Sequence, residues 1–450
     1  MKQTNKLWQK DISVDGKIES FTIGMDNQLD LKLAKYDVLG SMAHITMLQT
    51  IGLLSGKELE TLKKELRGIY RVIESDNFQI ESGVEDVHSQ VELLLTRKLG
   101  DIGKKIHAGR SRNDQVLLDL KLFMREEIRQ IVELVERLTR RLLSLSEQYK
   151  HVLMPGYTHM QVAMVSSFGL WFGAFSESLV DDLHLLKPAF DIVNRNPLGS
   201  AAGYGSSFPL NRQLTTDLLG FESMNYNVVY AQMGRGKAER VVSSAMSNIA
   251  DTLSRLAMDV CIYMGQNHGF VQFPDNLTTG SSIMPHKKNP DVFELIRAKC
   301  NQIKSLPNEI MMITANLPTG YHRDLQIMKE HLMPGIDVLK HCLEMTDFML
   351  QSVIINTDII NKEIYKYLFT VEKVNELVLS GVPFREAYQK VGEEVSAGTF
   401  KFDKEIQHTH EGSLGNLQNQ QITNKLDHLL AEFQKHFEKV KISFDRLLSD

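Results

Sequence analysis

The chain has 450 residues, of which 42% are hydrophobic and 24% charged, and its net charge is -5. This composition is typical of a large globular protein, and the length alone suggests about three domains. Charges of both signs are interspersed, which argues against a nucleic-acid or anionic-membrane partner. No apolar run is long enough to span a bilayer, and the first residues lack the apolar core of a signal peptide. We therefore expect a cytoplasmic protein.

The cysteines do not indicate a metal site or a disulfide. Cys261, Cys300 and Cys342 are far apart in the sequence, and none of them belongs to a C-x-x-C pair. Buried, reduced thiols are the simplest interpretation. The histidines do not complete a zinc-binding spacing with them, so we predict no metal ligands.

Helical periodicity begins near Tyr36 and continues over most of the chain. Residues 36–48 and 59–73 are predicted helices, and the polar stretch at Ser55 separates them. A third helix begins near Glu85. His88 lies in its first turn, where a polar residue is common without any role in a site.

Residues 107–115 read HAGRSRNDQ and stand directly before a long helical pattern. Their Ser, Asn and Asp side chains can cap a helix, and Arg110 or Arg112 can bind a carboxylate near its N-terminus. The plainer alternative is an ordinary cap with solvated arginines. No Gly or Pro occurs from Ser111 to Met154, which predicts one helix of about 35 residues, or about 50 Å.

Residues 154–161, MPGYTHMQ, interrupt this pattern. Thr158 and His159 can hydrogen-bond an anion, and a histidine titrates near neutral pH, although a turn with a satisfied histidine is the commoner case. Two further long helices are predicted, over residues 168–193 and 238–270. Between them lies a glycine-rich stretch that lacks the Gly-Lys-Ser/Thr of a phosphate-binding loop.

Residues 279–291 read TGSSIMPHKKNPD and predict an ordered loop that leads into a helix. Gly280 frees the backbone, while Pro285 and Pro290 exclude a regular helix across the stretch. Backbone N–H groups here can form an anion-binding nest, and Lys287 adds a full charge. In such a field Ser281 can act as a base or nucleophile. The alternative is a helix-start loop with a solvated lysine pair.

The motif GSSIMPxKxNP in this loop resembles the signature of the fumarase/aspartase superfamily. The resemblance implies that Ser281 is the base and that Lys287 and Asn289 contact the substrate carboxylate and the carbanion formed from it. His286 departs from the Gln usual in argininosuccinate lyases, whereas some adenylosuccinate lyases carry His. The motif by itself therefore identifies the superfamily and leaves the substrate open.

Other motifs resemble the argininosuccinate lyases within this superfamily. The stretch GRSRNDQ is the most specific of them, and GYTHMQ and residues 317–330 match more loosely. The last of these keeps three expected residues, but Ile327 and Met328 replace an acidic pair and His322 replaces Asn. Residues 233–236 keep only Arg235 of a usual S-D-R-D. The substrate-contacting residues that the resemblance implies are His88, Ser111, Arg112, Asn113, Thr158, Gln161, Tyr321, Gln326 and Lys329, with His159 as a candidate acid or orienting group.

We predict an all-α fold, with a central bundle of long helices over residues 108–355. Smaller helical domains flank it at residues 1–107 and 356–450, and the match fades into a polar tail from about Ser396. The motifs lie at helix ends too far apart to meet within one bundle. This conflict is resolved if several chains contribute to each site, and the resemblance implies a homotetramer with sites built from three subunits.

The implied reaction is the anti β-elimination of argininosuccinate to arginine and fumarate, a step of arginine biosynthesis, with no metal and no organic cofactor. One alternative is another fumarate-releasing lyase, acting on adenylosuccinate or on an acylated argininosuccinate. A second alternative is an inactive structural homologue, as some lens crystallins are. The Ser281, Lys287, Asn289 and His159 side chains argue against that one.

Overall fold

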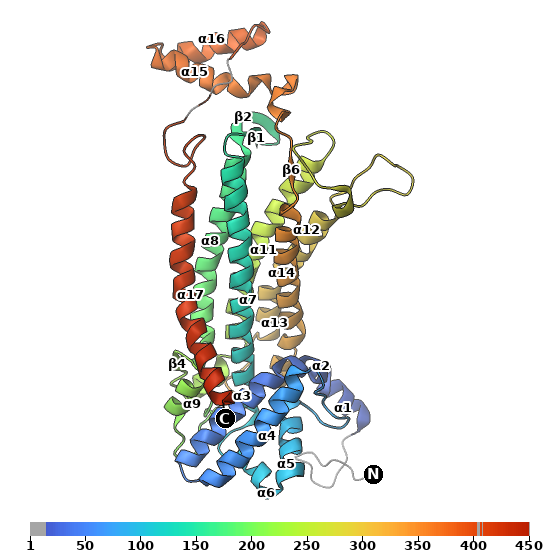
Figure 1. The fold of residues 1–450 in the computed structure, drawn as a ribbon, viewed down its shortest axis with the longest axis vertical. Coiled ribbons are helices and arrows are strands. Elements are labelled where there is room, and N and C mark those ends of the chain that lie inside the picture. Colours follow the sequence, from blue (N-terminus) through green and yellow to red (C-terminus); the bar gives the residue numbers. More distant parts are fainter. Residues whose placement is uncertain (1–14, 403–405, 407, 450) are drawn as a thin grey trace.

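Long helices run side by side along the molecule and form its central bundle (Figure 1). We analyse a computed structural model, which describes residues 15–402, 406 and 408–449. Their apolar side chains build one continuous core. The predicted all-α fold is confirmed. The long helices are α7 (Arg112–Gln148), α8 (Phe168–Val193), α11 (Lys237–Met264), α14 (Met328–Leu350) and α17 (Asn419–Leu448).

Helix α7 sets the length of the bundle. It begins at a capping box, in which the Asn113 N–H donates to the Ser111 hydroxyl and the Ser111 N–H donates to Asp114. It then runs for 37 residues, or about 55 Å at 1.5 Å per residue. The long helix predicted from the sequence is therefore present, and its two ends lie at opposite ends of the molecule (Figure 1).

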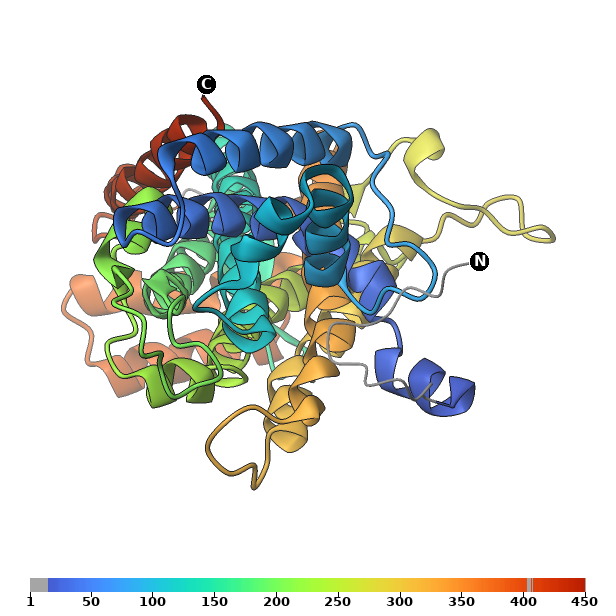
Figure 2. The same cartoon turned by 90° about the horizontal axis from the view of Figure 1, so that it is seen from below.

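A group of shorter helices covers the lower end of the bundle, as the view from below shows (Figure 2). Helix α3 is at its centre, with nearly every side chain from Ala34 to Leu48 buried against α4, α5 and α7. The predicted helices in this region are all present. The bounds are α1 Gly16–Ile23, α2 Asp26–Leu29, α3 Ala34–Thr50, α4 Gly56–Glu74, α5 Val87–Leu99 and α6 Asp101–Lys104.

The remaining helices are short. Helices α12 and α13 pack beside α11 and α14, while α15 and α16 lie at the upper end (Figure 1). Their bounds are α9 Arg212–Leu218, α10 Val228–Met233, α12 Asp291–Ile303, α13 Leu306–Ile313, α15 Thr370–Leu379 and α16 Phe384–Ser396. Among the described residues, no helix combines the length and the apolar composition needed to cross a bilayer.

A β-hairpin stands at the upper end of α7 and α8, where the sequence predicted only an interruption (Figure 1). Strands β1 (Leu153–Thr158) and β2 (Gln161–Ser167) pair antiparallel. The other strands have two residues each: β3 (Arg195–Asn196) pairs parallel with β4 (Ser223–Met224), and β5 (Val271–Gln272) pairs antiparallel with β6 (Ile354–Ile355). These strands are too short to change the fold class.

One boundary prediction was wrong, and one long helix was missed. The third long helix ends at Met264 and not at Phe270, because Gly265 follows and the chain turns into β5. The segment described as a polar tail contains α17, which packs along α7 and α8. Its buried stripe includes Phe433, whose ring centroid lies 5.9 Å from that of Phe190. Abundant charged residues on its outer face had concealed the helical pattern. The division of the chain into three domains stays a prediction.

Candidate functional site

A cavity of about 530 Å³ lies at the N-terminal end of α7. Its walls come from segments far apart in the sequence: the N-terminal segment, the start of α5, the start of α7, and residues 321–329. Seven of the predicted site residues line it: His88, Ser111, Arg112, Asn113, Tyr321, Gln326 and Lys329.

Ser111 is both the cap of α7 and part of the cavity wall. Its partner Asp114 also accepts hydrogen bonds from the N–H groups of Gly199 (3.0 Å) and Ala201 (2.8 Å). Burial raises the pKa of Asp114 to about 6, although these three backbone bonds favour the ionised form. One carboxylate therefore fastens the glycine-rich stretch to the helix start.

Arg112 meets two acidic residues at the cavity. Its guanidinium forms ion pairs with Glu85, at 3.2 Å, and with Asp86. Asp86 is also the N-cap of α5 and accepts from the Ser89 N–H at 2.8 Å. Burial works against ionisation of Asp86, but the charges of His88 and Arg112 hold its pKa below its usual range. Both acids, which the sequence did not assign to a site, orient the arginine.

Lys329 is buried in the cavity wall, with only 4% of its surface exposed. Its ammonium lies 2.7 Å from a carboxylate oxygen of Asp26 and 2.6 Å from one of Asp30. Burial raises the pKa of Asp26, and the ammonium opposes that rise. The N-terminal segment thus supplies two acids that the sequence did not assign to a site.

Residues 321–326 close another side of the cavity. The Gln326 amide donates to the carbonyls of Thr22 (2.9 Å) and Ile23 (3.1 Å) at the end of α1. The Tyr321 ring lies 5.6 Å from the guanidinium carbon of Arg235. Arg235, the residue kept within 233–236, also lines the cavity.

The departures from the family pattern have local explanations. Gly236 has φ +82°, and a Cβ there would lie 2.6 Å from Cγ2 of Thr314, so no larger residue fits. Gly236 is the N-cap of α11, and its N–H donates to the carboxylate of Glu239 in the first turn of that helix. Met328 is buried in the core, whereas Ile327 is exposed. These positions keep the backbone of the site while removing acidic groups.

Thr158, His159 and Gln161 lie at the exposed tip of the β-hairpin. Thr158 and Gln161 are paired across the strands, which leaves His159 and Met160 as a two-residue turn. Both turn residues have positive φ, 52° and 59°, as a type I′ turn requires. Left-handed backbone at non-glycine residues is strained and is often retained for function.

The loop over residues 279–289 projects sideways from the bundle in both views (Figures 1 and 2). Thr279 and Asn289 bridge its base, with the Asn289 N–H donating to the Thr279 carbonyl at 2.9 Å. The Ser281 hydroxyl accepts from the N–H groups of Ile283 (3.3 Å) and Met284 (3.2 Å). Two backbone donors of the loop are therefore directed at the serine, and the anion-binding nest stays a prediction.

The predicted site residues thus form three separate groups. The cavity group lies at the N-terminal end of α7, and the hairpin tip lies beyond its C-terminal end, about 55 Å away. The exposed loop forms the third group, and none of its residues lines the cavity. A small substrate cannot reach all three within one copy of the chain.

Comparison with known proteins assigns the family. A family model described as "Lyase" matches residues 13–304. A protein named argininosuccinate lyase from Bacteroides thetaiotaomicron is 62% identical over 95% of this chain and 96% of its own length. The chain belongs to the argininosuccinate lyase family. A relative of the same name from Thermotoga neapolitana is 38% identical over 87% of this chain and 98% of its own length. The chain is thus a lyase by family, and the resemblance read from its motifs is confirmed.

Solved structures agree on the fold of this family member. An EDDS lyase in complex with formate superposes with a TM-score of 0.77 at 21% identity, covering 97% of this chain and 94% of that one. A class II fumarase from Schistosoma mansoni superposes with a TM-score of 0.70 at 17% identity, covering 84% and 88%. At such identities the likeness concerns the fold alone.

Proposed function

We propose that this chain cleaves argininosuccinate to arginine and fumarate by anti β-elimination, as a cytoplasmic step of arginine biosynthesis. One observation carries the proposal: Ser111, Arg112 and Asn113, from the motif that resembles argininosuccinate lyases most specifically, line the cavity beside Lys329. Its cationic groups suit the carboxylates of such a substrate. Its acidic groups, Asp26 and Asp30 among them, suit the cationic ones.

Ser281 is the proposed base, which removes the proton on the carbon next to a substrate carboxylate. A serine hydroxyl is a weak base until its alkoxide is stabilised. The two N–H groups that point at its oxygen, from Ile283 and Met284, favour the alkoxide by hydrogen bonding and by their dipoles. The loop therefore supplies the activation that this role demands.

The intermediate is a carbanion whose charge is delocalised into the neighbouring carboxylate. Lys287 and Asn289, on the same loop, are the proposed groups that hold this carboxylate as charge develops. The electron pair of the carbanion then forms the double bond of fumarate, and the bond from carbon to the guanidino nitrogen breaks. His159 is the proposed acid that protonates or orients the departing nitrogen.

The active unit is proposed to be a homotetramer in which different copies supply parts of each site. The cavity and the hairpin tip are separated by about the length of α7, about 55 Å, which is much longer than argininosuccinate. Antiparallel packing of long bundles brings the upper end of one copy beside the lower end of another. The projecting loop is free to reach a neighbour in such an assembly.

The test is the absorbance of fumarate after purified protein is mixed with argininosuccinate. The proposal expects a rise that depends on protein concentration and yields arginine in equal amount. Adenylosuccinate and an Nα-acylated argininosuccinate are the comparison substrates, because the 233–236 and 327–328 departures remove acidic groups. Folded protein that releases fumarate faster from either comparison substrate than from argininosuccinate would contradict the proposal.

A further inference from the structure

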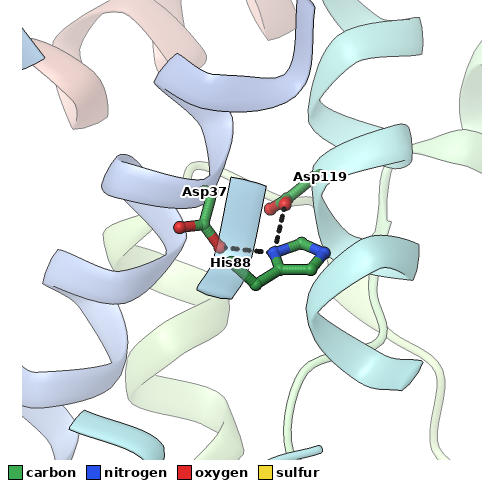
Figure 3. A group of neighbouring side chains, drawn as sticks. All are labelled: Asp37, His88 and Asp119. Carbon is green, nitrogen blue, oxygen red and sulfur yellow. Dashed lines mark hydrogen bonds and ion pairs between the residues drawn. The ribbon is translucent and has the colours of Figure 1, made fainter. Parts of the chain in front are cut away.

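Three buried side chains meet where helices α3, α5 and α7 cross (Figure 3). Nδ1 of His88 lies 2.8 Å from Oδ1 of Asp37 and 3.4 Å from Oδ2 of Asp119. The exposed fractions are 6% for His88, 2% for Asp37 and 1% for Asp119. Two carboxylates therefore face one edge of the imidazole in a region that water does not reach.

The opposite edge of the His88 ring is free of protein partners among the described residues. Figure 3 shows Nε2 pointing away from both carboxylates, and His88 lines the cavity that we assign to substrate binding. The ring therefore has one nitrogen held inside the protein and one available to a ligand. Gln115 supports the inner side by donating to Asp37 Oδ1 at 3.3 Å.

Charged groups from α3, from α7 and from the residue before α5 surround the Nδ1 edge of the His88 ring. Asp37 comes from α3 and Asp119 from α7, while Asp86 precedes α5. The buried Arg110, before α7, donates to the Ser41 hydroxyl at 3.0 Å and attracts Asp37 and Asp119.

Four further charged groups lie at greater range, and they act on the members of this cluster. The charge of Asp30 acts on Asp119, and that of Arg112 acts on Asp86. His107 interacts with His88, and Glu92 interacts with Asp37. Acidic groups dominate the immediate surroundings of Nδ1.

We propose that Asp37 and Asp119 are positioning residues that hold His88 as an imidazolium with its Nε2–H directed into the cavity, where it donates to a substrate carboxylate. This inference rests on the proposed function of the cavity. The fixed cation binds the fumarate half of the substrate in the ground state and in the carbanion alike. Asp37, the nearer carboxylate, is the principal partner, and Asp119 is secondary.

The electrostatics support this geometry. Burial alone would lower the pKa of His88, but the hydrogen bond to Asp37 and the charges of Asp37, Asp86 and Asp119 raise it to about 9. Burial, with the nearby charge of Asp37, raises the pKa of Asp119 well above its usual range. Asp37, at 2.8 Å from Nδ1, is therefore the principal counter-ion of the imidazolium, and Asp119, at 3.4 Å, is the weaker partner.

A metal site is the competing interpretation, since one oxygen or nitrogen from each of the three residues lies within 4.8 Å of the others. Three donors fall short of the four that a structural zinc takes from protein. A separation of 2.8 Å between Nδ1 and Oδ1 is that of a hydrogen bond. The guanidinium of Arg110 adds a positive charge that opposes a cation here.

The decisive experiment compares Asp37→Asn with Asp119→Asn, two changes that preserve shape. The kcat/KM for fumarate release is measured from pH 6 to pH 9 as a ratio to wild type. Without Asp37 the histidine pKa falls toward about 6.5. The Asp37→Asn ratio should then be near one at pH 6 and fall ~10²-fold by pH 8.5. The loss should appear mainly in KM, and Asp119→Asn should lose less than about tenfold throughout.

A purely structural role for Asp37 would lower the ratio equally at every pH, and that result would overturn the inference. A second readout needs no turnover, so a failure of the proposed function is recognised separately. The raised pKa of His88 stabilises the fold fully below about pH 6.5, and this contribution is lost as pH rises through about 9. The difference in Tm between wild type and His88→Gln should shrink over that range. A constant difference would also overturn the inference.

Discussion

Charged side chains at the cavity are paired with partners in the same chain, whereas those at the loop and at the hairpin tip are exposed. At the cavity, Lys329 is paired with Asp26 and Asp30, and Arg112 with Glu85 and Asp86. At the loop, the Lys287 side chain is exposed to solvent. At the upper end, the hairpin tip that carries His159 is exposed as well.

This contrast fits a division in which the cavity binds the substrate and the loop and hairpin tip carry out the reaction. The cavity groups are oriented by partners within the same chain, so the substrate of the proposed reaction would meet a preorganised surface and replace only some internal contacts. Backbone hydrogen bonds fix the loop and the hairpin tip, but their side chains are exposed to solvent. In the proposed tetramer they become a reaction site only when another copy covers them, and this would exclude water from the step that creates charge.

Replacement of the base should have the largest effect. Ser281→Ala leaves the backbone donors of Ile283 and Met284 in place but removes the proton acceptor. We expect kcat to fall by ~10²–10⁴-fold, the usual contribution of general base catalysis, with KM little changed. Steady-state fumarate release measures both parameters. A folded Ser281→Ala protein that turns over at nearly the wild-type rate would eliminate the serine as base.

The adjacent lysines offer a matched pair. Lys287→Met removes the proposed charge on the developing carbanion and should lower kcat by ~10²–10³-fold. Lys288 instead pairs with Asp275 on the surface, so Lys288→Met should stay within about threefold, since exposed pairs contribute little. Similar losses in the two variants would mean that the loop acts through its net charge and not through Lys287 itself.

Replacement of a buried charge at the cavity should lower the free energy of unfolding. Lys329→Met leaves Asp26 and Asp30 as uncompensated acids in a buried wall, and breaking such a group costs about 3–5 kcal/mol. Lys32→Met is the control, because its pair with Asp337 is about 40% exposed and is worth at most about 1 kcal/mol. Denaturant unfolding of both variants makes the comparison. Equal losses would show that the Lys329 pairs are not protected from solvent.

The cavity end should also be sensitive to acid. His44 is fully buried, and burial with the nearby charge of Arg110 lowers its pKa to about 3. Its neutral form stabilises the fold fully above about pH 6.5, and this stability is lost as pH falls toward 3. The loss should reach ~1.4 kcal/mol per pH unit. His44→Met should flatten the fall in Tm between pH 6.5 and 5, and an unchanged slope would rule out His44 as its source.

The smallest effect is expected at the hairpin tip. Met160 has φ +59° and is 71% exposed. Met160→Gly should therefore remove about 1 kcal/mol of backbone strain and raise Tm slightly. Met164→Gly, within strand β2, should lower Tm instead because a strand interior disfavours glycine. If Met160→Gly also lowers Tm, the strain at the tip is compensated by contacts that the single chain does not reveal.

Much of this architecture was predictable from the sequence. The absence of Gly and Pro after Ser111 predicted the length of α7, and the motif loops located the cavity residues 111–113 and the donors around Ser281. The hairpin was missed because Pro155 and Gly156 indicate a break, and because its turn residues, His159 and Met160, are not the Asn-Gly or Asp-Gly pair that identifies a type I′ turn in a sequence. The acids that pair with Lys329 and Arg112 were missed because an ion pair between segments far apart in the chain produces no recognisable pattern in the sequence.

The other failures have different causes. Helix α17 was described as a polar tail because its buried stripe, with Leu426 and Phe433, is narrow among many charged residues. The sequence showed that 233–236 lacks the usual acidic residues, but it did not show that Thr314 leaves no room for a Cβ at Gly236 or that Glu239 accepts from the Gly236 N–H at the start of α11. Local packing decided both outcomes, and packing is not visible in a single sequence.

We infer that the cavity and the loop of one active site belong to different copies of the chain. Mixing tests it most directly: Ser281→Ala and Arg112→Ala proteins, each nearly inactive alone, are unfolded together and refolded as mixed tetramers. If two copies contribute, random assembly leaves about one site in four with both groups intact, and activity should return to about 25% of wild type. Activity no greater than the average of the two parents would place both groups in the same copy and contradict the account.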